Sequence, residues 1–260
     1  MTNRSKPQER RFLTAQVVAS KELSPNFVRV TIGGESLRDF TPMGFDQWFR
    51  LFLPTEKGLR LPTWTNGAWF AQYMLMPKDI RPIGRNYTVR AHREAGLFSD
   101  GPEIDIDFAL HADESGNLGV ASAWAKAAAP GAELGILDEG VTYQPTPGAE
   151  WQLLVGDETA LPAIMGILGS APRDLRAAVY IEIPHADDAQ LMDAPAGAEI
   201  HWLVRNENRA LDAVRAATLP SGPGYAFVAG GQKLAAGVRR HLVGDRKMPK
   251  DSVTFTGYWR

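Results

Sequence analysis

Hydrophobic and polar positions alternate along most of the first half of the chain. In the segment EIDIDFAL, Ile104, Ile106 and Phe108 fall on one side of an extended strand, and Asp105 and Asp107 fall on the other. The segments TAQVVASKEL, NFVRVTIGG and QWFRLFLP follow the same two-residue period. Because Gly and Pro break the chain between such short segments, the pattern predicts an antiparallel β-barrel or a β-sandwich.

One helix interrupts these strands. The segment GVASAWAKAAAPG begins with small residues, has an Ala-rich body and stops at Pro130 and Gly131, which predicts a helix between two strands. The following AELGILDEG returns to an extended pattern. Residues 56–84 show neither period and predict a long irregular connection, ordered in part by its aromatic residues.

The pattern changes near residue 149. The apolar run WQLLVG is followed by the helical segment DETALPAIMGILGSA, and strand-like and helical segments then alternate to the end of the chain. Buried strands that alternate with helices predict a mainly parallel sheet with helices on both faces. We therefore expect a flexible arm at residues 1–11, a barrel domain at 12–148 and an α/β domain at 149–260.

The composition narrows the function. With 44% hydrophobic and 22% charged residues the chain is typical of globular proteins, and its net charge of −2 argues against a protein that coats nucleic acid. The absence of cysteine excludes disulfides, thiolate-held clusters and cysteine-based zinc sites, so any redox chemistry needs a bound cofactor. No apolar run is long enough to cross a membrane, and we expect a cytoplasmic, monomeric protein.

The segment RNYTVR places two arginines, a tyrosine and a threonine within one predicted strand. An edge strand with solvated arginines is one interpretation, and a site for a flat anionic ligand is the other, because Tyr offers a ring and Arg binds phosphate bidentately. The helix start at Gly119, Ala121 and Ser122 supports the second, since free backbone N–H groups and the helix dipole attract anions. Ser122 alone could equally be an ordinary helix cap.

These motifs, together with IDIDFALHADESGNLGVASAWAKAAAPGAELGILDEG, WQLLVGDETALPAI and the terminal GYWR, resemble the siderophore-interacting protein family. Members of that family are FAD-dependent ferric-siderophore reductases within the ferredoxin-reductase-like superfamily. The resemblance implies that the barrel holds FAD and that the α/β domain receives NADPH or NADH.

The resemblance also assigns residues. Tyr87 is expected to stack by the isoalloxazine, Thr88 to approach the reactive N5 edge of the flavin, and Arg85 to meet the pyrophosphate. The remaining residues assigned to FAD continue the flavin strand, begin the phosphate-binding helix or lie beside the cofactor: Val89, Arg90, Gly119, Ala121, Ser122, Asp107 and His111.

The segment GDETALPAI opens a helix after an apolar strand, where a dinucleotide would bind, although it lacks the G-x-G-x-x-G fingerprint. Thr159 is expected to bind a phosphate or the nicotinamide, and Asp157 and Glu158 are expected to face ribose hydroxyls or to cap the helix. A bulky anionic ferric complex suits a basic pocket, for which Arg50, Arg81 and Arg260 are the candidates; no metal site is predicted within the protein.

The expected function is reduction of a ferric siderophore: electrons pass from NAD(P)H through FAD to Fe(III), and Fe(II) is released in the cytoplasm. Two alternatives remain open at this point. One is a general flavin or ferric-chelate reductase of the same superfamily, and the other is a siderophore-binding protein that does not reduce its ligand. The sequence leaves the siderophore class and the choice between NADH and NADPH undecided.

Overall fold

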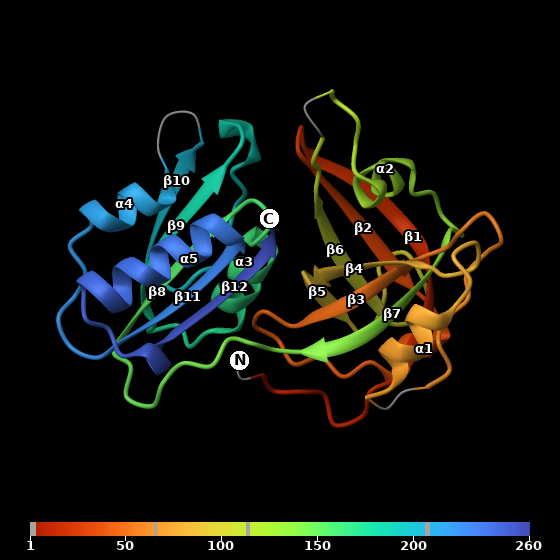
Figure 1. Cartoon of the computed structure of the whole chain (residues 1–260), viewed down its shortest axis with the longest axis horizontal. Helices are drawn as coiled ribbons and strands as arrows, with labels where there is room; N and C mark the ends of the chain where they lie inside the picture. The colour runs from red at the N-terminus through yellow and green to blue at the C-terminus, as the bar shows by residue number, and fades with distance from the viewer. Residues whose placement is uncertain (1–3, 65–66, 113–114, 206–208) are drawn as a thin grey trace. The chain divides into compact units, whose positions relative to one another are not determined.

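The computed structural model describes residues 4–64, 67–112, 115–205 and 209–260, and the chain divides into two compact units (Figure 1). The barrel unit comprises residues 5–43 and 47–140, and the α/β unit comprises residues 44–46 and 141–260 together with Arg4. Among the described residues, no helix is long and apolar enough to cross a bilayer.

The barrel unit contains seven antiparallel strands in the order β4-β3-β7-β1-β2-β6-β5. They are β1 (Phe12–Ser24), β2 (Phe27–Gly33), β3 (Trp48–Leu53), β4 (Ile83–Thr88), β5 (Ala91–Arg93), β6 (Glu103–Ala109) and β7 (Glu133–Gly140), with a 3₁₀ turn at Glu35–Asp39 and helices α1 (Trp69–Leu75) and α2 (Val120–Ala127).

The two ends of this sheet meet. Only Val89 and Arg90 separate β4 from β5 in sequence, although these strands stand at opposite ends of the sheet order. The N–H of Val89 donates to the carbonyl of Gln47 (2.8 Å), and the N–H of Arg90 donates to the carbonyl of Asp105 (2.9 Å). The sheet therefore curls into a barrel, and the predicted antiparallel barrel is confirmed.

The alternation in the sequence sets the two faces of β3. Phe49, Leu51 and Leu53 are fully buried in the barrel core, whereas Phe52 points to the other face and packs against Trp69 of α1 (6.1 Å between ring centroids). The stretch 56–84, predicted to be irregular, thus contains a seven-residue helix. A helix of two turns carries too few positions for its period to be recognised, and aromatic packing rather than propensity orders it.

The α/β unit contains a five-stranded parallel sheet in the order β10-β9-β8-β11-β12. Its elements are β8 (Trp151–Asp157), α3 (Leu161–Ser170), β9 (Arg176–Ile183), a 3₁₀ turn (Ala186–Asp188), β10 (Gly197–Val204), α4 (Ala210–Ala216), β11 (Gly224–Gly231), α5 (Gln232–Arg240), a π turn (His241–Asp245), a second 3₁₀ turn (Lys250–Ser252) and β12 (Val253–Trp259).

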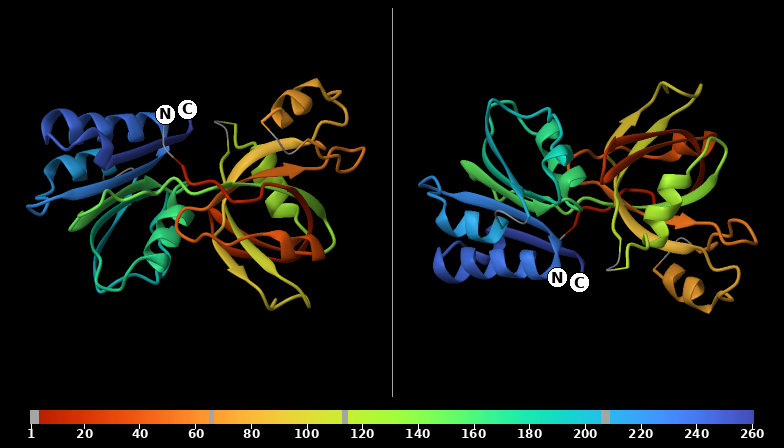
Figure 2. Two further views of the ribbon diagram at one scale, coloured as in Figure 1. Left: turned by 90° about the horizontal axis from the view of Figure 1, so that it is seen from below. Right: turned by 90° about the horizontal axis from the view of Figure 1, so that it is seen from above.

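Helices cover both faces of this sheet, as predicted. Val214 of α4 and Val238 of α5 pack with Leu153 and Val155 of β8 on one face, and Figure 2 shows α3 on the opposite face. The strand β12 was not predicted, because the terminal GYWR was interpreted only for its aromatic and basic chemistry. Asp46 joins residues 44–46 to the rest of this unit, because its carboxylate accepts hydrogen bonds from the N–H groups of Thr142 (3.0 Å) and Tyr143 (2.9 Å).

Candidate functional site

The predicted flavin strand is held by aromatic packing. Tyr87 of β4 lies opposite Phe49 of β3, and its ring packs against Phe108 of β6 with 4.2 Å between centroids. Phe108 in turn contacts Trp124 of α2 (5.8 Å). The strand that carries RNYTVR, the strand β6 and the helix α2 therefore meet around Phe108, which brings together the two motifs singled out in the sequence (Figure 1).

The two residues of this strand that carry hydroxyl groups, Tyr87 and Thr88, are largely buried. Burial raises the pKa of the Tyr87 phenol, so this hydroxyl stays protonated and can donate a hydrogen bond at any physiological pH. Thr88 is 8% exposed and Val89 is 9% exposed. Arg85 is exposed, and its Nη1 donates to the carbonyl of Gly84 (2.8 Å). The strand thus offers an aromatic ring, two hydroxyls and an exposed guanidinium.

The start of α2 suits a phosphate. Its N-cap residue is Gly119, which has no side chain to accept from the first-turn N–H groups. A Cβ built on Gly119 would meet nothing closer than the carbonyl oxygen of His111 at 3.8 Å, so the approach to these N–H groups is open. Ala121 lies in this first turn and is buried. These residues fit the pyrophosphate of FAD.

Ser122 does not cap its own helix. Its Oγ accepts a hydrogen bond from the N–H of His111 (3.1 Å), while the N–H of Gly119 donates to the carbonyl of His111 (3.0 Å). This pair of bonds fixes the helix start against the end of the β6 segment. The Ser122 hydroxyl keeps its own hydrogen for donation, and the His111 side chain is exposed at the same place.

Asp107 lies next to this site but is enclosed by arginines. Its carboxylate is 1% exposed and accepts from Nε (2.6 Å) and Nη2 (2.8 Å) of Arg29 on β2. Nε of Arg90 lies 3.6 Å from the same carboxylate. The role of Arg29 cannot be predicted from local sequence, because its place opposite Asp107 depends on the strand register.

At the carboxyl ends of the parallel strands, Asp157 joins three segments. It accepts hydrogen bonds from the N–H of Thr159 (3.0 Å), the N–H of Gly231 (2.6 Å) and the indole N–H of Trp259 (3.1 Å). The backbone of Gly230 has a positive φ of 124°, and a Cβ there would come within 2.6 Å of the Asp157 carboxylate. The approach of Asp157 therefore requires glycine at 230, and the ring of Trp259, which a Cβ on Gly231 would meet at 2.8 Å, requires it at 231.

A charged network, unnoticed in the sequence apart from Glu158, lies beside Asp157. Glu158 pairs with Arg205 at the end of β10, and Arg205 Nε also donates to Glu182 of β9 (3.0 Å). Burial, followed by the neighbouring Asp157, raises the pKa of Glu158 to about 7, although Arg205 opposes the shift. The sequence carries one signal for this network, which is a charged residue at the end of each apolar strand. Because parallel strands direct their carboxyl ends to one edge of a sheet, such residues are expected to lie close together.

The three arginines expected at the substrate lie in different surroundings. Arg50 donates to the buried Glu139 (2.6 Å) and lies over the ring of Trp69 (5.2 Å). Arg81 lies over the ring of Tyr73 (5.7 Å), and both rings belong to α1. Arg260 follows β12 in the α/β unit and is exposed. Arg50 and Arg81 thus flank α1 within the barrel unit.

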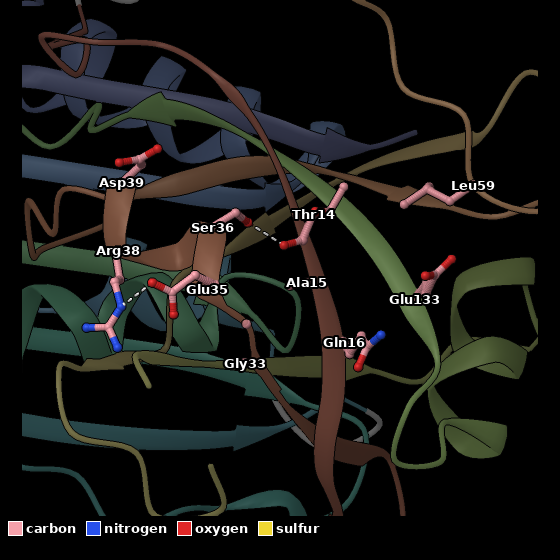
Figure 3. A pocket seen from close by; sticks show the side chains of 11 residues that line it. Thr14, Ala15, Gln16, Gly33, Glu35, Ser36, Arg38, Asp39, Leu59 and Glu133 are labelled. Carbon is pink, nitrogen blue, oxygen red and sulfur yellow. Dashed lines mark hydrogen bonds and ion pairs between the residues drawn. The ribbon is translucent and has the colours of Figure 1, made fainter. Parts of the chain in front are cut away.

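A separate cavity of about 960 Å³ opens on the barrel between β1, the 3₁₀ turn Glu35–Asp39 and β7 (Figure 3). Its carboxylates are Glu35, Asp39 and Glu133, and its arginine, Arg38, pairs with Glu35 (2.7 Å). None of the residues predicted to bind cofactor or substrate lines it. This acidic lining does not suit an anionic dinucleotide.

Comparison with known proteins identifies the two units. The sequence model of the siderophore-interacting FAD-binding domain matches residues 16–143, and that of the siderophore-interacting protein matches residues 149–260. The chain belongs to the siderophore-interacting protein family. This confirms both the resemblance found in the sequence and the prediction of FAD as the cofactor of this chain.

Relatives and solved structures agree over nearly the whole chain. An uncharacterized protein of Mycobacterium tuberculosis is 33% identical over 94% of this chain and 89% of its own length. The ferric vibriobactin reductase ViuB of Vibrio cholerae is 29% identical over 94% of this chain and 87% of its own. The structure of a siderophore utilization protein from T. fusca superposes with a TM-score of 0.78 at 28% identity, covering 99% of this chain and 96% of that chain.

The fold extends beyond the family. The ferredoxin reductase in carbazole 1,9a-dioxygenase has a TM-score of 0.64 at 17% identity, covering 97% of this chain and 71% of that chain. The predicted ferredoxin-reductase-like, two-domain fold is thereby confirmed.

Proposed function

We propose that this protein is a ferric-siderophore reductase that uses FAD and a pyridine nucleotide. The observation that supports the proposal is the meeting of β4, β6 and α2 around Phe108, which joins the strand that carries Tyr87 to the helix whose start has no side-chain cap. A relative over nearly the full length of the chain is a ferric vibriobactin reductase. Bound FAD supplies the change from two-electron to one-electron transfer that connects a nicotinamide to Fe(III).

The barrel unit is assigned to FAD. Arg85 and the first turn of α2 would bind its phosphates, Tyr87 would pack along the isoalloxazine, and Thr88 would donate to the flavin edge. No side chain is needed as general acid or nucleophile in this reaction. These residues act by holding and orienting the cofactor.

The α/β unit is assigned to the pyridine nucleotide. Its parallel strands end at one edge, where α/β sheets bind nucleotides. Thr159 is placed at this edge by Asp157, whose oxygens already accept three backbone and indole N–H groups. Asp157 would therefore shape the nucleotide site by holding the ends of β8, β11 and β12, with Thr159 as the residue that meets the ligand.

The substrate is a ferric siderophore, and its reduction would release Fe(II) in the cytoplasm because siderophores hold Fe(II) far more weakly. Arg50, Arg81 and Arg260 are the residues assigned to offset the negative charge of the complex, and the rings of α1 offer Arg50 and Arg81 a fixed position. The protein would act as a monomer, without binding nucleic acid or entering a membrane.

Anaerobic spectroscopy tests the proposal. The FAD-loaded protein should lose its yellow colour on addition of NADPH or NADH and regain it with a ferric siderophore, while a ferrous-specific chelator registers Fe(II). Free riboflavin as acceptor is the comparison: equal reoxidation by riboflavin would identify a general flavin reductase instead. Failure of either nucleotide to reduce the flavin would refute the proposed electron path.

A further inference from the structure

Three buried carboxylates form a ladder on the outer face of β6. Glu103, Asp105 and Asp107 alternate with the core residues of this strand and are 0%, 5% and 3% exposed. Strand register places Thr31 opposite Asp105 and Arg29 opposite Asp107. Buried carboxylates are retained only with charged or hydrogen-bonding partners, so the distribution of partners along this ladder is informative.

The first two carboxylates share one arginine. Arg93 donates to Asp105 (2.7 and 2.8 Å) and to Glu103 (3.1 and 3.3 Å), and Thr31 adds a hydrogen bond to Asp105 (2.7 Å). Glu103 also accepts hydrogen bonds from the backbone N–H groups of Leu97 and Phe98 and from the hydroxyl of Ser99. This part of the ladder carries more negative than positive charge.

The third carboxylate has the opposite balance. Arg29 holds Asp107 through a two-pronged contact (2.6 and 2.8 Å), whereas Nε of Arg90 stands 3.6 Å from it. Within the part of the chain that the structure describes, this buried Nε has no hydrogen-bond acceptor. Two arginines therefore face one carboxylate, and the close contact belongs to Arg29. Arg90 keeps a net positive charge that Asp107 does not cancel.

Arg90 ends the RNYTVR segment, two residues after Thr88. We propose that Arg29 is a positioning residue for the flavin: by occupying Asp107 it leaves Arg90 available to an anionic group of FAD. This inference rests on the assignment of RNYTVR to the flavin under the proposed function. Arg29 itself need not touch the cofactor.

The physical reason is competition between two anions for one guanidinium. Without Arg29, Asp107 would be a buried carboxylate whose nearest cation is Arg90, and it would draw Arg90 into the two-pronged contact. FAD would then bind only by separating that pair. Burial lowers the pKa of Arg90 and Arg29 lowers it further, while Asp107 raises it, which agrees with a cation that lacks a full partner.

The Kd of the full-length apoprotein for FAD tests this inference directly. Quenching of flavin fluorescence measures the Kd, and circular dichroism checks that each variant is folded. Arg29→Gln should raise the Kd for FAD about tenfold, the scale of one charge interaction. The double variant Arg29→Gln with Asp107→Asn removes the competing carboxylate and should return the Kd to within about threefold of wild type. Arg93→Gln, which breaks the neighbouring ion pairs, is the matched control and should change the Kd less than about twofold.

Each outcome decides a separate point. Arg90→Gln should weaken FAD binding at least as much as Arg29→Gln; if it has no effect, the assignment of RNYTVR to the flavin fails and the inference fails with it. If Arg90→Gln weakens binding and Arg29→Gln does not, the inference alone is overturned. Equal losses in Arg29→Gln and Arg93→Gln, or no recovery in the double variant, would show that the ladder serves only the fold.

Discussion

Two groups of buried carboxylates, Glu103 and Asp105 in the barrel and Glu158 in the α/β unit, behave in opposite ways. In the barrel, burial opposes ionisation of Glu103 and Asp105, but hydrogen bonds from backbone N–H groups, Thr31 and Arg93 outweigh it, so both pKa values lie below their usual range. In the α/β unit, burial together with Asp157 outweighs Arg205 and raises the pKa of Glu158 to about 7. The number and placement of donors decide the sign, because desolvation is present in both.

The difference matches the ligand assigned to each unit. Glu103 and Asp105 stay ionised through the physiological range, which gives a cofactor bound to the barrel a constant charge on this face of β6. Glu158 titrates near neutrality and lies at the edge of the parallel sheet, where a nucleotide is proposed to bind and leave in every turnover. The charge of Glu103 and Asp105 is therefore fixed, whereas the charge of Glu158 changes with pH near neutrality.

The largest expected effect comes from removing the carboxylate that joins the ends of the parallel strands. Asp157→Ala should lower the free energy of unfolding of the α/β unit by roughly 3–5 kcal/mol, because it leaves the buried N–H of Gly231 and the partly buried indole N–H of Trp259 without their acceptor. Urea unfolding followed by tryptophan fluorescence measures it. The exposed Asp187→Ala is the control and should change stability by less than about 0.5 kcal/mol.

FAD binding sharpens this test. The barrel unit contains all residues assigned to FAD, so flavin affinity of Asp157→Ala should remain near wild type at low urea. A loss of flavin that parallels the loss of stability would contradict the separation of the two units' roles.

The next effect is a pH dependence. The folded-state pKa of Glu158 is raised from 4.5 to about 7, so its contribution to stability is complete below the ordinary pKa and is lost as the pH rises through about 7. Gln mimics the neutral acid. Between pH 5.5 and 8.5, Glu158→Gln should gain on the order of 2–3 kcal/mol of stability relative to wild type.

Urea unfolding of both proteins at the two pH values measures this difference. Asp105 and Glu103 of the barrel show the opposite pH dependence. Because their pKa values are lowered, their contribution to the free energy of unfolding is present at neutral pH and is lost only as the pH falls toward strong acid. A stability difference between Glu158→Gln and wild type that does not change with pH would show that Glu158 is ionised throughout.

The sequence predicted the helices and strands better than it predicted which side chains contact each other. The two-residue period placed Phe49 and Phe108 in the barrel core correctly, and the Ala-rich segment predicted α2. The period shows which face a residue occupies but not which strand lies opposite. Arg29 and Asp107 are 78 residues apart, and Arg205 and Glu158 are 47 apart, so only the strand order brings them together.

Helix α1 and strand β12 were missed for related reasons. Helix α1 is too short to show a period. Its Trp69 is buried against Phe52 of β3, and a long connection separates that strand from the helix. Strand β12 ends at Trp259, whose indole is fixed by Asp157 at the end of β8. Both depend on contacts between distant segments, which no local pattern encodes.

A smaller effect concerns the flavin ring. Tyr87→Ala should weaken FAD binding by roughly 1–2 kcal/mol, the scale for losing one stacked aromatic ring, and it also leaves Phe108 without its neighbour. Tyr87→Phe keeps the ring and serves as the control. Titration of the apoprotein with FAD measures both variants. Equal losses in the two would assign the effect to the hydroxyl rather than to stacking.

The smallest effect is expected for the substrate arginines. Arg50→Ala should raise the KM for an anionic ferric siderophore by an amount corresponding to about 0.5–1 kcal/mol, less at high salt, because a partly exposed charge is screened.

Arg10 offers a matched control within the barrel unit, since it also pairs with Glu139 and lies over the ring of Trp69 (5.6 Å). Arg10→Ala disturbs the same carboxylate and ring but is not assigned to the substrate. Steady-state reduction of one ferric siderophore at low and high ionic strength separates the two. A salt-dependent rise in KM for Arg50→Ala, absent in Arg10→Ala, supports the assigned pocket; equal changes in both would attribute the effect to the loss of packing around Glu139 and Trp69.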